Sequence, residues 1–200
     1  IDKISIIKGA SSLKYAGDAV GGVIIAETSK EKLLDSIYGN VTTNLQSNGR
    51  GGGISTDYTK TYSSGWYYKF QGTLKRMGDF ETPNYVMTNT GFSEHNLSLK
   101  AGLNRIDHGF DVYYSLFSNY LGILRSSHAH TAIDIINAIE NEVPHIIEDF
   151  SYDINIPRQK ISHNLLKLRG FKNFDFGKLS MRYDFQSNDR KEYDIRRGDR

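Results

Sequence analysis

The segment WYYKFQGTLK, Trp66–Lys75, decides the fold because apolar and polar residues alternate along it with a period of two. Successive side chains of a β-strand point to opposite faces, so this pattern predicts a strand with one apolar and one polar face. Phe70 and Leu74 belong to the apolar set, whereas Lys69 and Lys75 belong to the polar set. A sheet built from such strands has polar side chains on one face and apolar side chains on the other.

Six further segments of the chain alternate in the same way. They cover about Ile37–Gln46, Gly53–Tyr62, Asn96–Asn104, Phe110–Asn119, Ile161–Phe171 and Leu179–Gln186. Consecutive strands with this pattern predict one antiparallel sheet of seven strands in meander order. We therefore expect an all-β fold, with the charged tail from Ser187 to Arg200 starting a loop after the last strand.

The connections between these segments differ in length in a regular way. Three are short and carry Gly, Asp or Asn, as hairpin turns require, namely Tyr62–Gly65, Asp107–Gly109 and Asn173–Gly177. The connections in between include the long segments Gly78–Ser93 and Gly122–Lys160, with Asn48–Gly53 as a short exception. Outer-membrane β-barrels have short turns on one side and long loops on the other, so this segregation favours a barrel over a soluble sandwich.

Composition excludes several classes of protein. The formal net charge of +2 predicts no strong nucleic-acid partner, and the absence of cysteine excludes a disulfide scaffold. Mean hydropathy is −0.50, and no apolar run approaches the ~20 residues of a membrane-spanning helix. A membrane-spanning strand needs only every second residue to be apolar, so its average hydropathy is that of a soluble segment. Ile1 does not open a signal peptide, so we expect an internal fragment if the chain belongs to an outer membrane.

The N-terminal stretch ISIIKGASSLKYAGDAVGGVIIAE, Ile4–Glu27, has a different character. Two short β-branched runs flank a Gly-rich connection, in which Ser11 is expected to cap a helical turn. The Lys and hydroxyl residues of a phosphate-binding P-loop are missing after Gly17, so we interpret the connection as a structural turn. Its core, KGASSLKYAGDAVGGVI, resembles the end of the plug domain of TonB-dependent outer-membrane receptors.

The rest of the chain resembles the first barrel strands of the same family, most clearly at Gly65–Tyr85 and Tyr113–His128. The resemblance implies that residues 1–28 end a plug domain, residues 29–36 are a linker, and residues 37–200 begin a transmembrane β-barrel. The fold expected from it is thus a partial antiparallel barrel, about seven meander strands of a plugged barrel of ~22, preceded by a plug remnant.

The family resemblance also implies a function. The intact protein would import a scarce large nutrient, such as a ferric siderophore, haem or cobalamin, across the outer membrane. Its partners would be outer-membrane lipid and the inner-membrane TonB complex, with no resident cofactor and no enzymatic activity. Lys8, Gly9 and Ala10 favour this metal-chelate branch over the branch that imports glycans or peptides. A passive or adhesin-type barrel and a soluble all-β binding domain stay open as alternatives.

Candidate site residues fall into two groups. The first comprises basic residues expected on the polar face, where they would meet the plug or an anionic ligand: Lys69, Lys75, Lys100, Arg105 and Arg182. The second comprises His128 and His130 in the long loop, next to a helix predicted over about His128–Asn141. Two residues apart on a helix point to different faces, which favours solvated histidines over ligands of a metal or haem iron. The motifs of hydrolases and metalloproteases are missing.

Overall fold

A computed structural model describes residues 3–15, 19–27, 34–127, 132–141 and 143–194 of the chain. The chain forms two compact units, residues 1–32 and 33–200. The boundary between them falls within the predicted linker, residues 29–36. No strand pairing connects the two units among the described residues.

The small unit is a two-stranded antiparallel sheet. Strand β1 (Lys3–Ile7) pairs with β2 (Val23–Glu27), so that the two β-branched runs of the sequence lie side by side. The 3₁₀-helix η1 (Gly9–Lys14) lies in the connection, and Lys8 precedes it without a side-chain cap. The expectation that Ser11 caps this turn is therefore wrong.

A neighbouring serine fastens this connection. The Ser12 side-chain oxygen lies 2.7 Å from the Gly9 carbonyl oxygen and 2.6 Å from that of Ala19, and Ser12 is 1% exposed. Its single hydroxyl proton serves one of these acceptors at a time. Ser12 thus ties the start of the Gly-rich connection to its end, which is a structural role.

The large unit is built around one sheet of seven strands, as predicted. The strands are β3 (Ser36–Gln46), β4 (Gly51–Thr61), β5 (Trp66–Met77), β8 (Phe92–Asn104), β9 (His108–Gly122), β10 (Arg158–Phe174) and β11 (Gly177–Tyr193). They lie in this order, and every neighbouring pair is antiparallel. The sheet is not closed within this chain, because β3 and β11 are its outer strands.

The last strand is longer than predicted. Strand β11 continues through the charged segment from Ser187 to Tyr193, which pairs in register with Arg158–Asn164 of β10. The expectation of a loop from Ser187 onward is therefore wrong. Cross-strand polar contacts accompany the extension, such as the 2.7 Å hydrogen bond from Gln159 Nε2 to Glu192 Oε1. The backbone ladder forms here without apolar side chains, and this is why alternation did not reveal it.

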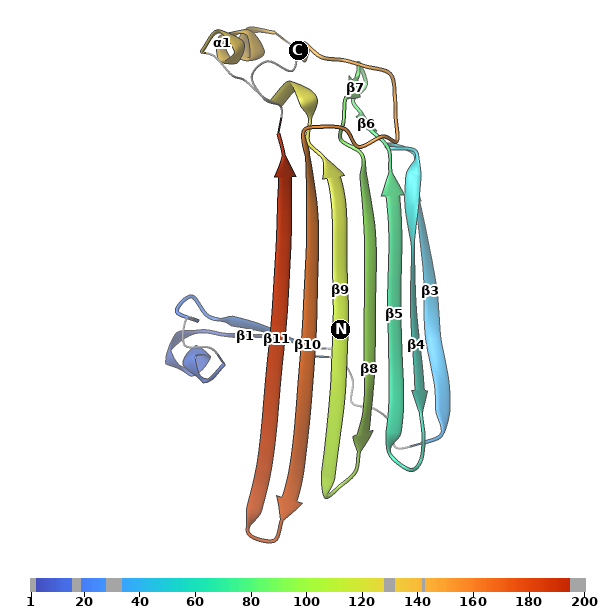
Figure 1. The fold of residues 1–200 in the computed structure, drawn as a ribbon, viewed down its shortest axis with the longest axis vertical. Coiled ribbons are helices and arrows are strands. Elements are labelled where there is room, and N and C mark those ends of the chain that lie inside the picture. Colours follow the sequence, from blue (N-terminus) through green and yellow to red (C-terminus); the bar gives the residue numbers. More distant parts are fainter. Residues whose placement is uncertain (1–2, 16–18, 28–33, 128–131, 142, 195–200) are drawn as a thin grey trace. The chain divides into compact units, whose positions relative to one another are not determined.

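The two long connections lie at one end of the strands together with the short β3–β4 connection, and the other three short turns lie at the opposite end (Figure 1). The β5–β8 connection contains a small hairpin, β6 (Phe80–Glu81) and β7 (Val86–Met87). The β9–β10 connection contains the 3₁₀-helix η2 (Arg125–Ser127) and helix α1 (Ala132–Glu140). The structure thus contains the helix predicted in the long loop, within the range expected for it.

The best-buried part of the large unit lies at its long-loop end. Asp79, 2% exposed, accepts hydrogen bonds from the backbone N–H groups of Thr90 at 2.8 Å, Gly91 at 3.3 Å and Ser151 at 3.3 Å. Asn89 makes a second tie, donating to the carbonyls of Ile123 and Pro157 at 2.9 and 2.7 Å. These two side chains join the β5–β8 and β9–β10 connections into one packed cap.

Candidate functional site on the two faces of the sheet

The strand register gathers the apolar sets of the seven strands on one face. One row across the sheet shows this: Gly39, Tyr58, Phe70, Leu99, Tyr114, Leu166 and Phe185. Phe70, Leu99 and Phe185 are 37%, 46% and 54% exposed. Isolated exposed apolar residues are ordinary on soluble proteins, but a continuous exposed apolar face marks contact with a membrane or another protein.

The apolar zone crosses the strands obliquely. On β3 it reaches Leu45, whose row across the sheet carries Arg76, Lys160 and Lys191 on the other strands. On β11, in contrast, the continuous apolar series ends at Phe185, six register pairs nearer the short-turn end than Lys191, and only Tyr193 follows it on this face. The strands of this sheet therefore cross the apolar zone at an angle, as tilted strands do.

Aromatic residues gather at the short-turn end of the same face. The rings of Trp66 and Phe110 meet edge to face with centroids 5.6 Å apart, and those of Tyr62 and Tyr68 do so at 6.3 Å. The Lys60 ammonium lies 4.8 Å from the centre of the Tyr62 ring. Amphipathic rings together with long basic side chains are typical of a membrane–water boundary.

The opposite face carries most of the predicted site residues. Lys69, Lys75, Lys100 and Arg182 all belong to the polar set of their strands, and Lys69 stands directly opposite Lys100. In the adjacent row Arg169 stands opposite Arg182. Like charges placed directly across a sheet repel one another, so this face needs neighbouring carboxylates or an external anion to balance it.

Asp111 supplies part of this balance. Its Oδ1 lies 3.5 Å from Lys100 Nζ and 3.9 Å from Arg169 Nε, and its side chain is 15% exposed. Tyr67 packs beside it, 3% exposed, with the Lys100 ammonium 5.0 Å from the centre of its ring. Sequence reasoning missed Asp111 and Arg169, since they meet only through the strand register.

Glycine makes room for this cluster. Gly102 lies directly opposite both Tyr67 and Asp111. A Cβ atom there would come within 2.8 Å of the Tyr67 hydroxyl oxygen and 2.9 Å of the Asp111 Cβ. The close approach of the three strands' side chains at this point therefore depends on the missing side chain of Gly102.

The remaining predicted residues lie elsewhere. Lys75 Nζ pairs with Glu94 Oε1 at 3.0 Å further along the polar face, and the Arg182 guanidinium pairs with Asp184. Arg105 lies beyond the end of β8, where its Nε donates to the Ser64 carbonyl oxygen at 3.2 Å, so it is a turn residue. His128 and His130 lie outside the described residues.

One short turn contains a histidine beside a carboxylate whose pKa is lowered. His108 Nδ1 lies 2.9 Å from Asp107 Oδ2 between β8 and β9. The hydrogen bond from His108 lowers the pKa of Asp107 from its ordinary value of 3.8. Within the described parts of the chain, no group of three or more histidines and carboxylates is placed to hold a metal ion. Among those same residues, none of the helices is both long and apolar enough to cross a membrane.

Comparison of the chain with protein-family models, curated proteins and solved structures found no match.

Proposed function

We propose that this chain is part of a TonB-dependent outer-membrane receptor that imports a scarce large nutrient. In this proposal residues 1–28 are the end of the plug domain and residues 37–200 are the first seven strands of the barrel. The observation that carries the proposal is the exposed apolar face, which extends over seven antiparallel strands with the long connections at one end. Each square ångström of apolar surface removed from water contributes roughly 25 cal/mol, so such a face is costly unless lipid covers it.

The proposal assigns a side to each end of the sheet. The long-loop end, with its packed cap around Asp79 and Asn89, faces the exterior, where ligand arrives. The short-turn end faces the periplasm, from which the TonB complex acts on the plug. The polar face lines the lumen, and its basic residues Lys69, Lys100 and Arg182 meet the plug or an anionic ligand.

The ligand class is a metal chelate, haem or a cobalamin-like molecule. Such a solute is large and dilute, so binding at the outer mouth has to precede passage through the barrel. A passive or adhesin-type barrel is the alternative for the sheet, but it gives no role to the plug-like stretch Lys8–Ile24. A soluble all-β domain is the alternative for the whole chain, but it leaves the apolar face in water.

The test uses the intact protein that contains this chain, expressed with its own upstream sequence. We expect it in the outer-membrane fraction, and we expect import of a ferric siderophore, haem or cobalamin to stop when the TonB complex is deleted. Import that continues without the TonB complex favours a passive barrel. A monodisperse, detergent-free monomer in size-exclusion chromatography favours a soluble domain and overturns the proposal.

A further inference from the structure

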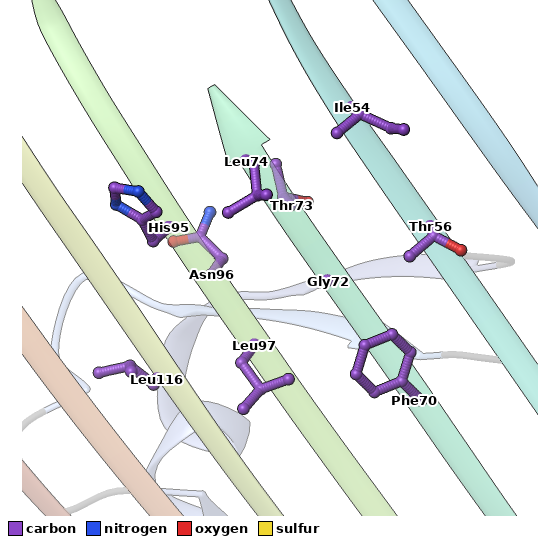
Figure 2. Close-up of a pocket in the computed structure, with 10 residues that line it drawn as sticks. All are labelled: Ile54, Thr56, Phe70, Gly72, Thr73, Leu74, His95, Asn96, Leu97 and Leu116. Carbon is purple, nitrogen blue, oxygen red and sulfur yellow. The ribbon is translucent and has the colours of Figure 1, made fainter. Parts of the chain in front are cut away.

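A hollow of about 370 Å³ interrupts the apolar face in the middle of β5 (Figure 2). Gly72 lies at its centre, with Thr56 of β4 and Leu97 of β8 directly opposite on the two sides. Phe70 and Leu74, the neighbouring same-face residues of β5, mark its two ends along the strand. The hollow is therefore lined mainly by hydrocarbon.

The backbone does not require glycine at this position. Gly72 is not among the residues with positive φ, and a Cβ atom there would lie 3.2 Å from Phe70 Cζ and 3.8 Å from Thr56 Cγ2. A larger residue could be accommodated by a small movement of the Phe70 ring. Glycine in the interior of a strand weakens the sheet and marks a place where another molecule approaches closely.

Polar and basic residues follow the hollow towards the long-loop end of the same face. His95 of β8 stands opposite Leu74 and lines the hollow towards the long-loop end. One row further on, Arg76 stands opposite Ser93, and its guanidinium donates to the Tyr152 carbonyl oxygen. Phe70 bounds the hollow towards the short turns, and Arg76 lies just outside the lining at the other end, so an occupant that extends past Leu74 reaches from hydrocarbon to positive charge.

We propose that this hollow binds one acyl chain of an anionic lipid, with a lipid phosphate at Arg76. The inference rests on the proposed function, because it requires the apolar face to meet lipid. The acyl chain covers Gly72 and fills the space between Thr56 and Leu97. The phosphate pairs with the guanidinium of Arg76, which is a preferred partner for such groups.

The test is lipid retention by the intact protein purified from membranes in dodecyl maltoside and measured by native mass spectrometry. The probes are phosphatidylglycerol and phosphatidylcholine with identical acyl chains. We expect Gly72→Leu to fill the hollow and to lower phosphatidylglycerol retention about tenfold. Gly170→Leu is the matched control, since Gly170 lies on the same face and a Cβ there meets only the Gly109 carbonyl oxygen at 3.8 Å.

A second pair of variants tests the headgroup. Arg76→Gln is expected to lower phosphatidylglycerol retention to the level of phosphatidylcholine, whereas Lys167→Gln, on the opposite face, leaves the preference unchanged. Excess inorganic phosphate should not displace the lipid. Equal retention by wild type and Gly72→Leu overturns the inference, and so does displacement by phosphate alone, which indicates an anion site without an acyl chain. If the protein is recovered from the membrane fraction but fails these tests, only this inference is refuted. The proposed function then still stands.

Discussion

The two faces of the large sheet are built from the same strands but differ in which side chains they expose. On one face, apolar residues such as Leu99 are exposed, and few of their neighbours are charged. On the other face, Lys100 and Asp111 are partly buried within a cluster of charges. Alternation with a period of two produces both faces at once, so a shift of one residue would exchange them. The fold thus leaves the apolar residues of one face exposed and brings the charges of the other face together where they can pair.

The sharpest way to break this comparison is to place one charge on each face at the same level. In the proposed membrane barrel, Leu99→Arg should cost about 2–4 kcal/mol of folding free energy, because arginine would then lie in hydrocarbon. The adjacent Ser98→Arg, on the polar face, should cost far less. Unfolding by urea in lipid vesicles measures both. Equal losses would contradict the assignment of the two faces.

A smaller loss of folding free energy is expected from a change outside the two faces, in the packed cap at the long-loop end. Asp79→Ala removes the acceptor of three backbone N–H groups and should cost about 2–3 kcal/mol. Asp153→Ala is the control, since Asp153 is exposed in the same region. Hydrogen exchange of the Thr90 and Ser151 amides reports the change locally. If Asp79→Ala leaves the hydrogen-exchange protection of these amides unchanged, Asp79 does not hold the two loops together.

On the polar face, the removal of one negative charge should cause a still smaller loss of folding free energy. Asp111→Asn leaves Lys100 and Arg169 without their shared carboxylate and should cost about 1 kcal/mol, more at low salt than at high salt. Asp57→Asn, also on the polar face but outside the cluster, is the matched control. A salt dependence that is the same for both variants would argue against a specific cluster at Asp111.

The smallest effect concerns the short turn between β8 and β9. Because His108 lowers the folded-state pKa of Asp107, this contact adds stability above the unfolded-state pKa, near the ordinary value of 3.8. That contribution is lost as the pH falls through the lower, folded-state pKa. Wild type and Asp107→Asn should therefore differ at pH 5 to 6 and converge in strong acid. Asp175→Asn, in another short turn, controls for a general effect of charge removal.

The sequence predicted the strands and their faces because alternation is a local signal. It placed Leu99 and Lys100 on opposite faces correctly, and it located the short turns. It failed at the end of β11, where Ser187–Tyr193 pairs through the backbone although its side chains are polar. The expectation that Arg105 belongs to the polar face also failed: by alternation it falls in the apolar series of Leu103, and in the structure it lies in the turn after β8. Contacts such as Asp111 with Arg169 need the register of strands that are distant in sequence, and no local pattern contains it.

The bond between Asp79 and Ser151 has a consequence for the order of folding. These residues are 72 positions apart, so the cap cannot form by local collapse of either loop. The hairpins β8–β9 and β10–β11 each close through a short turn and have little loop entropy to overcome. The cap should therefore assemble last, after the hairpins have docked side by side, and its amides should be the last to gain protection in a refolding experiment.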